Sequence, residues 1–299
     1  MSESRFTPQA RKEIATFLIL TFALSSIFYV ILGSAHTLSL GGGRYVLMLM
    51  WCPGVSALVT RMIYQRNVRG EGWGLKQPRW AVLAYTLPIA YALVAYGTVW
   101  LSGYGAVDVS RFHTPLLRFI LLGSVMSLVS ALGEELGWRG FLVPKLSEGW
   151  SFTRTALVSG IIWASWHMPL IILADYNGGT PTWYSITCFA IMVVGISFPF
   201  AWIRLRSGSV WPAAILHASH NLYIQGFFDN VTVDTGITKY LVSEFGAALA
   251  VTAVVTGDIV GRRRGRLKAA MTGAGAGEGR PQAHTRGARR QEARRERRW

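Results

Sequence analysis

The chain has 299 residues, of which 51% are hydrophobic and only 15% are charged, and its mean hydropathy is +0.33. This composition is too apolar for an ordinary soluble domain and is typical of a polytopic membrane protein. The formal net charge of +15 does not indicate a nucleic-acid partner, because residues 262–299 supply +10 of it with 13 basic and 3 acidic residues, and most other basic residues lie in short loops between apolar runs.

Apolar runs long enough to cross about 30 Å of hydrocarbon predict eight helices. The first run follows Arg5, Arg11 and Lys12 and is longer than the core of a signal peptide, so we interpret it as a retained span. The predicted fold class is all-α, a polytopic transmembrane helix bundle of about eight spans that occupies residues 1–261. The predicted spans are roughly 14–34, 45–64, 80–102, 116–138, 154–174, 184–204, 210–228 and 241–261.

Charges in the predicted loops indicate the orientation of the bundle. The loop between the second and third spans contains Arg66, Arg69, Lys76 and Arg79, whereas the loop between the fifth and sixth spans has Asp175 and no basic residue. Because basic loops stay in the cytoplasm, we expect both termini to be cytoplasmic in a multi-pass protein of the cell membrane.

The segment 262–299 is rich in arginine, glycine and alanine and has almost no apolar side chains. Such a segment cannot bury a core, so we expect a disordered cytoplasmic tail. Each basic residue near a negative leaflet contributes on the order of 1 kcal/mol, which makes anionic lipid the expected partner of the tail.

The most informative stretch is Gly-Glu-Glu-Leu-Gly-Trp-Arg at 133–139, where two adjacent carboxylates and an arginine end an otherwise uncharged apolar run. A carboxylate in such a run is costly and is usually kept only where it is paired and faces an interior cavity. On a helix, Glu135 and Arg139 are four residues apart and share a face, whereas Glu134 lies about 100° away. We therefore expect Arg139 to hold Glu135 and to leave Glu134 free for chemistry.

Further polar groups recur in the later spans, where His167 follows Trp163 by one turn and His217 precedes Asn221 by one turn. A lone histidine in an apolar helix is more often a packing residue, but several such groups in one bundle indicate a functional interior. A carboxylate and a histidine that converge on water can remove its proton, while a second histidine and an amide can stabilise an oxyanion. These side chains therefore predict amide hydrolysis, and the absence of a Gly-x-Ser-x-Gly elbow argues against a serine nucleophile.

Residue counting places this site near the cytoplasmic face of the membrane. If the fourth span ends at Arg139, Glu134 lies about 8 Å from that end at 1.5 Å per residue. If the seventh span starts at Val210, His217 lies about 10 Å from its own cytoplasmic end. The two depths agree.

With these motifs in this order, the chain resembles the family of CAAX proteases and bacteriocin-processing enzymes, the bacterial relatives of the type II CAAX prenyl endopeptidase. The resemblance covers about residues 115–225, and tryptophan replaces phenylalanine in the second motif. The motif Glu-Glu-x-x-x-Arg is met by Glu134, Glu135 and Arg139, Phe-x-x-x-His by Trp163 and His167, and His-x-x-x-Asn by His217 and Asn221.

The resemblance implies an intramembrane endopeptidase that acts on a membrane-associated protein or peptide. It implies that Glu134 and His167 activate the attacking water and that His217 and Asn221 form the oxyanion hole. The same family includes proteins of bacteriocin immunity and scaffolds without shown activity. The alternative functions are a non-catalytic membrane scaffold, a bacteriocin-immunity protein, or a proton-coupled transporter that uses the same buried charges without hydrolysis.

The sequence leaves the cofactor open between no metal and a divalent metal such as zinc. Glu134, His167 and His217 could supply one oxygen and two nitrogens to a catalytic zinc with an open position, as in a metalloendopeptidase. That arrangement needs a separate general base, so Glu135 would have to leave Arg139. We favour the water activated by Glu134 without metal, because it uses each residue where helical spacing places it.

Overall fold

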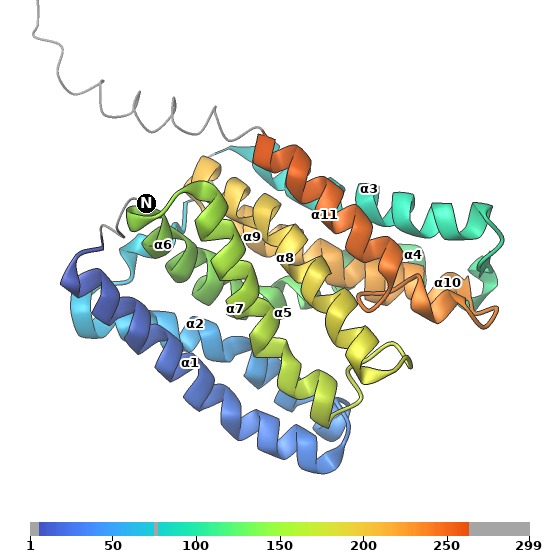
Figure 1. The fold of residues 1–299 in the computed structure, drawn as a ribbon, viewed down its shortest axis with the longest axis horizontal. Helices are drawn as coiled ribbons and strands as arrows, with labels where there is room; N and C mark the ends of the chain where they lie inside the picture. Colours follow the sequence, from blue (N-terminus) through green and yellow to red (C-terminus); the bar gives the residue numbers. More distant parts are fainter. Residues whose placement is uncertain (1–5, 75–76, 263–299) are drawn as a thin grey trace, which may run out of the picture. The chain divides into compact units, whose positions relative to one another are not determined.

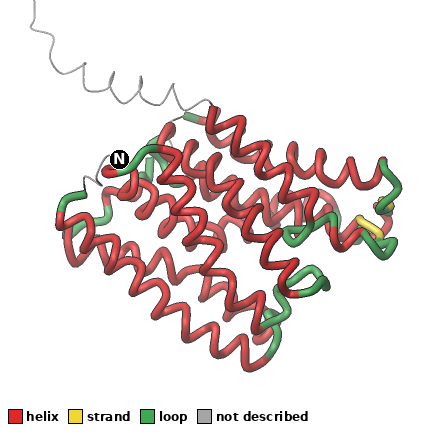
Figure 2. The backbone as a smooth tube through the Cα atoms, in the orientation of Figure 1, coloured by secondary structure: helices red, strands yellow, loops and turns green. Residues whose placement is uncertain are grey.

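The computed structural model describes residues 6–74 and 77–262, and nearly all of this part is helical (Figures 1 and 2). The described residues form eight long helices, two of which are composite. The single helices are α1 (Pro8–Ala35), α2 (Arg44–Gln65), α3 (Pro78–Leu101), α7 (Phe152–Leu173), α8 (Thr182–Ser207) and α11 (Ala247–Arg262).

The two composite helices contain π-helical segments, in which the hydrogen bonds span five residues instead of four. The fourth long helix, Leu116–Gly149, joins α4 (Leu116–Arg118), η4 (Phe119–Gly123), α5 (Ser124–Glu135), η5 (Leu136–Leu142) and α6 (Val143–Gly149). The seventh, at residues 211–231, joins α9 (Trp211–His220), η6 (Asn221–Phe228) and α10 (Asp229–Val231). All three π segments of the described chain lie in the two helices that carry the first and third sequence motifs.

The connections are short. Four are tightened by 3₁₀ turns, and two residues of β1 pair antiparallel with two of β2. These elements are η1 (Leu40–Gly43), η2 (Arg69–Glu71), η3 (Val109–Arg111), η7 (Thr238–Tyr240), β1 (Ala106–Val107) and β2 (Thr232–Val233).

The predicted helix bundle is confirmed, but not the number of spans. Six of the long helices in the described part are long and apolar enough to cross a membrane. The helix at residues 211–231 and α11 do not meet that criterion, so the count of eight spans stays a prediction. The predicted disordered tail lies outside the described residues, apart from Arg262 at the end of α11.

Successive helices run in opposite directions between two ends of the bundle. At the Glu71 end, which comprises residues 66–74, 149–152 and 207–211, the Gly72 carbonyl accepts a hydrogen bond from the Val210 N–H at 3.0 Å. At the Asp175 end, which comprises residues 36–43, 102–115, 174–181 and 232–246, Asp175 accepts a hydrogen bond from the Leu38 N–H at 2.7 Å. Each long helix therefore connects one end with the other.

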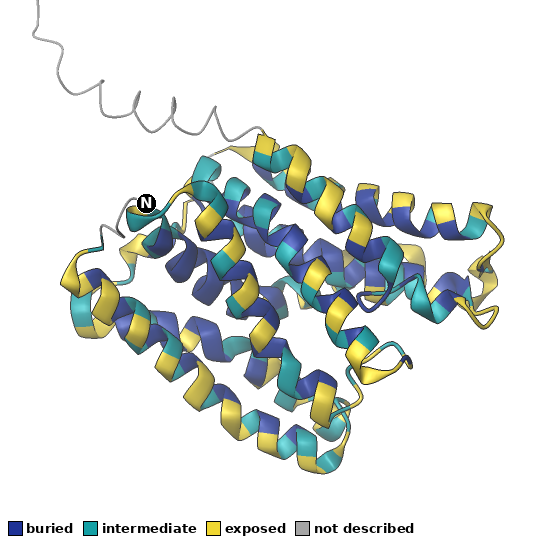
Figure 3. Cartoon of the chain, in the orientation of Figure 1, coloured by how far each residue is buried: buried dark blue, intermediate teal, exposed yellow. Residues whose placement is uncertain are grey.

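Exposed residues lie on the outer faces of the helices and buried residues face the interior of the bundle (Figure 3). Many of the exposed residues are large and apolar, and many of the buried ones are polar. Ile19 and Val30 on α1 are 68% and 70% exposed, whereas Thr21 and Ser25 on the same helix are buried. This inversion of the soluble pattern is expected where lipid replaces water around the bundle, because lipid does not penalise exposed aliphatic side chains.

Close contact with α2 fixes the helix that carries the two glutamates. A Cβ atom added at Gly133 would lie 2.7 Å from the Trp51 ring, and one added at Gly137 would lie 2.7 Å from the Pro53 carbonyl carbon. No side chain fits at either position, so the two glycines allow the backbones to approach. The motif is thereby held against α2 on both sides of Glu134.

Candidate active site

The motif helix continues well past the point at which the sequence predicts its end. The predicted span 116–138 stops at Arg139, but the helix runs to Gly149 and is buried from Gly133 to Val143. Glu134 therefore lies near the middle of this helix, not close to its end at Gly149. The residue count that placed the site near the cytoplasmic face started from a helix end that does not exist, so the depth of the site in the membrane stays a prediction without that support.

Glu135 lies between two cationic or potentially cationic partners. Its Oε1 accepts hydrogen bonds from Arg139 Nη1 at 2.8 Å and from His217 Nδ1 at 2.9 Å. The Arg139 guanidinium lies 4.0 Å from the centre of the Trp163 ring and 4.1 Å from that of Phe200. The predicted pair of Glu135 and Arg139 is present, and it also binds the third motif to the first.

Glu134 points away from that pair, as helical spacing predicts. Its Oε2 accepts a hydrogen bond from Trp163 Nε1 at 2.7 Å and a longer one from Trp138 Nε1 at 3.4 Å. Within the described part of the chain, its Oε1 has no hydrogen bond. Trp163 was predicted only as an aromatic wall, and the structure shows that it is also a donor.

His167 reaches the same region because the two helices run equally far from the turn that joins them. Glu134 lies 15 residues before Gly149, where the motif helix ends, and His167 lies 15 residues after Phe152, where α7 begins. Its Nδ1 lies 2.9 Å from the carbonyl oxygen of Trp163. A carbonyl oxygen can only accept, so Nδ1 carries the hydrogen and a neutral ring has its lone pair on Nε2. In the described residues, Nε2 of His167 has no hydrogen-bond partner of its own.

A cavity of about 150 Å³ collects these groups. The four side chains predicted to act on substrate, Glu134, His167, His217 and Asn221, all line it. Glu135 and Arg139, which were predicted to support them, are buried and do not line it. The rest of the wall is mainly apolar, with Val46, Leu49, Met50, Leu170, Met192, Val193, Ile196 and Phe200.

The described residues include no group of three or more histidine, cysteine, aspartate or glutamate side chains placed to hold a metal ion. The three predicted zinc ligands, Glu134, His167 and His217, therefore do not come together as such a group. The geometry does not fit a zinc site, and no step below passes through a metal.

A second polar cluster that sequence reasoning missed lines the same cavity. His220 Nε2 lies 3.0 Å from Glu244 Oε1, and Glu244 Oε2 accepts hydrogen bonds from Tyr176 at 2.8 Å and Gln225 at 2.9 Å. The Tyr91 hydroxyl contacts His220 Nδ1 on the other side of the ring. A single glutamate at the start of a predicted apolar span was the available signal, by the same rule that drew attention to Glu134.

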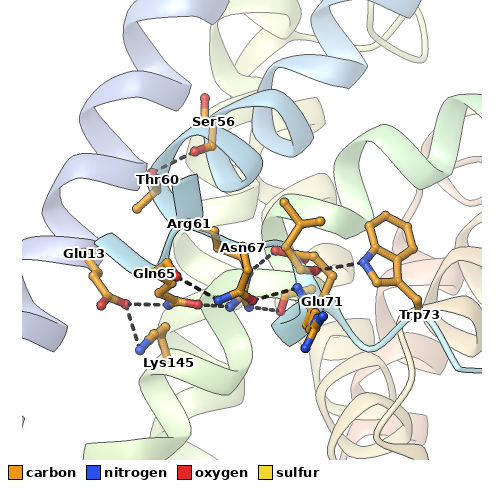
Figure 4. Close-up of polar contacts among 12 residues, drawn as sticks. Glu13, Ser56, Thr60, Arg61, Gln65, Asn67, Glu71, Trp73 and Lys145 are labelled. Atoms are coloured by element: carbon orange, nitrogen blue, oxygen red, sulfur yellow. Dashed lines mark hydrogen bonds and ion pairs between the residues drawn. The ribbon is translucent and has the colours of Figure 1, made fainter. Parts of the chain in front are cut away.

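A third cluster, at the Glu71 end, joins α1, α2, η2 and the motif helix (Figure 4). Glu71 is fully buried and forms an ion pair with Arg61, which also donates to the carbonyl of Gly140 at 3.2 Å. On α1, the Glu13 carboxylate accepts a hydrogen bond from Gln65 and forms an ion pair with Lys145, whose Nζ lies 2.8 Å from Oε2. Burial raises the pKa of the Glu71 carboxyl, and the guanidinium of Arg61 opposes that rise.

Comparison with known proteins supports the resemblance that the motifs indicate. Residues 116–223 match the family described as type II CAAX prenyl endopeptidase Rce1-like. The chain is also similar to CAAX prenyl protease 2 of Methanococcus maripaludis, with 32% identity over 125 residues, 40% of this chain and 42% of the relative. The chain thus matches less than half of that relative's length.

The predicted relation to the CAAX protease and bacteriocin-processing family is confirmed for this part of the chain. The matched residues begin with the motif helix and end just after Asn221, so they include all three motifs. Together with the six long apolar helices, the match identifies a multi-pass membrane protein.

Proposed function

We propose that the protein is an intramembrane endopeptidase that hydrolyses a peptide bond in its buried cavity. One observation carries the proposal: the cavity wall contains the four side chains that hydrolysis needs and excludes the two that only support them. The matched family and the name of the archaeal relative point to the same class of reaction. The substrate is proposed only as a membrane-associated protein or peptide.

The water would be activated between Glu134 and His167. Oε1 of Glu134 and Nε2 of His167 are the atoms of these side chains that have no protein partner in the described chain. A water that bonds to both can lose a proton as its oxygen attacks the carbonyl carbon. The C–N bond of the tetrahedral intermediate then breaks, and the same proton passes to the leaving nitrogen.

The oxyanion would be stabilised by His217 and Asn221. Nδ1 of His217 donates to the carboxylate of Glu135, and a ring that is also protonated at Nε2 would donate from there to the oxyanion. The Asn221 amide lies one turn further along the same helix and also lines the cavity. Two donors placed in a buried, mostly apolar cavity stabilise a developing negative charge far better than they would in water.

The test is cleavage of a peptide library by the full-length protein in detergent, with Glu134→Gln and His217→Ala as paired variants. We expect the wild type to cleave and both variants to lose at least about 100-fold in kcat, the cost of removing a general base or an oxyanion donor. Thermal unfolding should show that both variants remain folded. If Glu134→Gln cleaved at the wild-type rate, the endopeptidase mechanism would be wrong.

An inactive wild type would instead favour the scaffold, immunity or transporter alternative. A proton-coupled transporter needs titrating groups but has no evident use for the Asn221 amide beside His217. Asn221→Leu therefore separates the two classes. In an endopeptidase it should abolish hydrolysis, whereas in a transporter it should leave proton uptake into vesicles unchanged.

A further inference from the structure

We propose that Trp163 is a positioning residue for the general base, and that its indole N–H fixes the Glu134 carboxylate so that Oε1 faces the water. This inference rests on the proposed hydrolysis. It assigns to Trp163 a role that an aromatic wall does not have. The observation behind it is the hydrogen bond from Trp163 Nε1 to Glu134 Oε2, at 2.7 Å, across two different helices.

The hydrogen bond selects one oxygen of the carboxylate. Trp138 Nε1 approaches the same Oε2 at 3.4 Å, so both indole donors lie on one side of Glu134. An indole N–H can only donate, so Oε2 is held as an acceptor. Oε1 is left as the oxygen that can take a proton from water in the cavity.

The Trp163 ring is itself held rigidly, so the direction of its hydrogen bond to Glu134 is fixed. It is 97% buried, and the Arg139 guanidinium lies 4.0 Å from the centre of one face. The rings of Phe200 and His217 meet it edge-on, each with centroids 5.4 Å away. A side chain that is fixed on several sides gives its hydrogen-bond partner a fixed direction.

Trp163 also directs the second member of the water-activating pair. Its backbone carbonyl accepts the Nδ1 hydrogen of His167, so that Nε2 of His167 faces the site as the basic atom. One residue thus aligns Glu134 through its side chain and His167 through its backbone. Phenylalanine, which the related motif has here, would keep the second contact but could not make the first.

The test separates the N–H donor from the aromatic ring. Trp163 is replaced by phenylalanine and, in a second protein, by 3-benzothienylalanine, which has the shape of tryptophan with sulfur in place of the N–H. Both proteins are assayed on a peptide that the wild type cleaves. We expect kcat to fall about 10- to 100-fold in both, with KM within about twofold of wild type, because the base is misdirected while the cavity is retained.

Two results would overturn the proposal. Wild-type kcat in both variants would show that the hydrogen bond does not matter, and full activity with benzothienylalanine alone would show that only the ring shape matters. Trp183→Phe is the matched control, since Trp183 lies at the start of α8 and is 69% exposed, and it should leave kcat unchanged.

An infrared measurement tests the hydrogen bond even if no peptide is cleaved. The carboxylate band of Glu134 is isolated as the difference between wild type and Glu134→Gln, and the same difference is taken in the Trp163→Phe background. We expect the band to shift when the indole donor is lost. An unchanged band would reject the positioning role, whereas failure of the cleavage assay with a shifted band would reject only the proposed function.

Discussion

Both side-chain partners of Glu135 bind the same oxygen of its carboxylate. Its Oε1 serves both Arg139 and His217, while its Oε2 and the Nε of Arg139 are buried without partners in the described chain. Removing Arg139 leaves the buried charge of Glu135 without its guanidinium partner, in a place that water cannot reach. We therefore expect Glu135 to contribute mainly to stability. Its contribution to activity is that it holds His217 in place.

Arg139→Ala should lower the free energy of unfolding by roughly 3–5 kcal/mol, the cost of breaking a buried ion pair. Thermal unfolding in detergent measures the loss. The matched control is Arg262→Ala, because Arg262 pairs with Asp258 at the same four-residue spacing but is largely exposed. A surface pair of this kind contributes about 0–1 kcal/mol, so the control should unfold at nearly the same temperature as the wild type.

An Arg139→Ala protein that was as stable as the control would contradict the assigned role of Glu135 and Arg139. Full activity would do the same, since His217 would then need no anchored carboxylate.

The placement of Glu134, His167 and His217 bears on the metal question. Because these side chains do not come together as a metal-binding group in the described chain, we expect active protein to contain no stoichiometric zinc and to keep its activity after treatment with a chelator. Elemental analysis of the active sample measures the metal directly. Zinc at one atom per chain, with activity lost on removal and regained on its return, would establish the metal-dependent alternative.

Among the elements, the motif helix depends most on its contact with α2. Gly137 faces the Pro53 backbone with no room for a side chain, and Pro53 lies inside α2. The π segment η5 begins one residue before Gly137 and leaves carbonyl groups without the usual helical partner. Arg204 donates to the carbonyl of Arg139 at 2.7 Å, which satisfies one such group from α8.

Gly137→Ala should destabilise the protein by about 1–3 kcal/mol, because an added methyl group must push the two helices apart. The shift in unfolding temperature measures the effect. Gly97→Ala serves as the control, since Gly97 lies inside α3 with open space around its Cβ position. That change should be neutral or stabilising by up to about 1 kcal/mol, because alanine favours the helix.

If both alanine variants had the same stability, close packing between α2 and the motif helix would not be needed. A loss of activity in Gly137→Ala at unchanged stability would instead mean that helix spacing sets the geometry of Glu134.

For the whole molecule, basic side chains gather at the Glu71 end. Arg66, Arg69, Arg154 and Arg206 lie there or within a few residues, whereas the described loops of the Asp175 end carry mixed or acidic charges. Because basic segments are retained on the cytoplasmic side, we propose that the Glu71 end and both termini are cytoplasmic.

Matched cysteine variants test this orientation. Asn67 and Asn177 are exposed at opposite ends, so each can be changed to cysteine with little effect on packing. In intact cells, an impermeant maleimide should label Asn177→Cys and should reach Asn67→Cys only after permeabilisation. The native Cys52 and Cys188 are buried, so labelling of the wild-type protein gives the background signal. The reverse pattern would invert the proposed topology.

Local sequence properties were sufficient for the bundle and for the four polar side chains that line the cavity. Apolar runs predict where the long helices lie, because each helix must present a continuous apolar surface to lipid. The four-residue spacing predicts the pair of Glu135 and Arg139, because neighbours on a helical face are set by the chain itself. The three motifs also predict the family that comparison supports.

The end of the motif helix and the partners of its carboxylates were decided by tertiary structure. Lys145 and Glu148 look like loop residues in sequence, but Lys145 pairs with Glu13 on α1, so the helix can continue past Arg139. The donor to Glu134 is 29 residues away and the histidine on Glu135 is 82 residues away. Helical periodicity tells which face a side chain occupies but not which helix lies opposite, because that depends on how all the helices pack together.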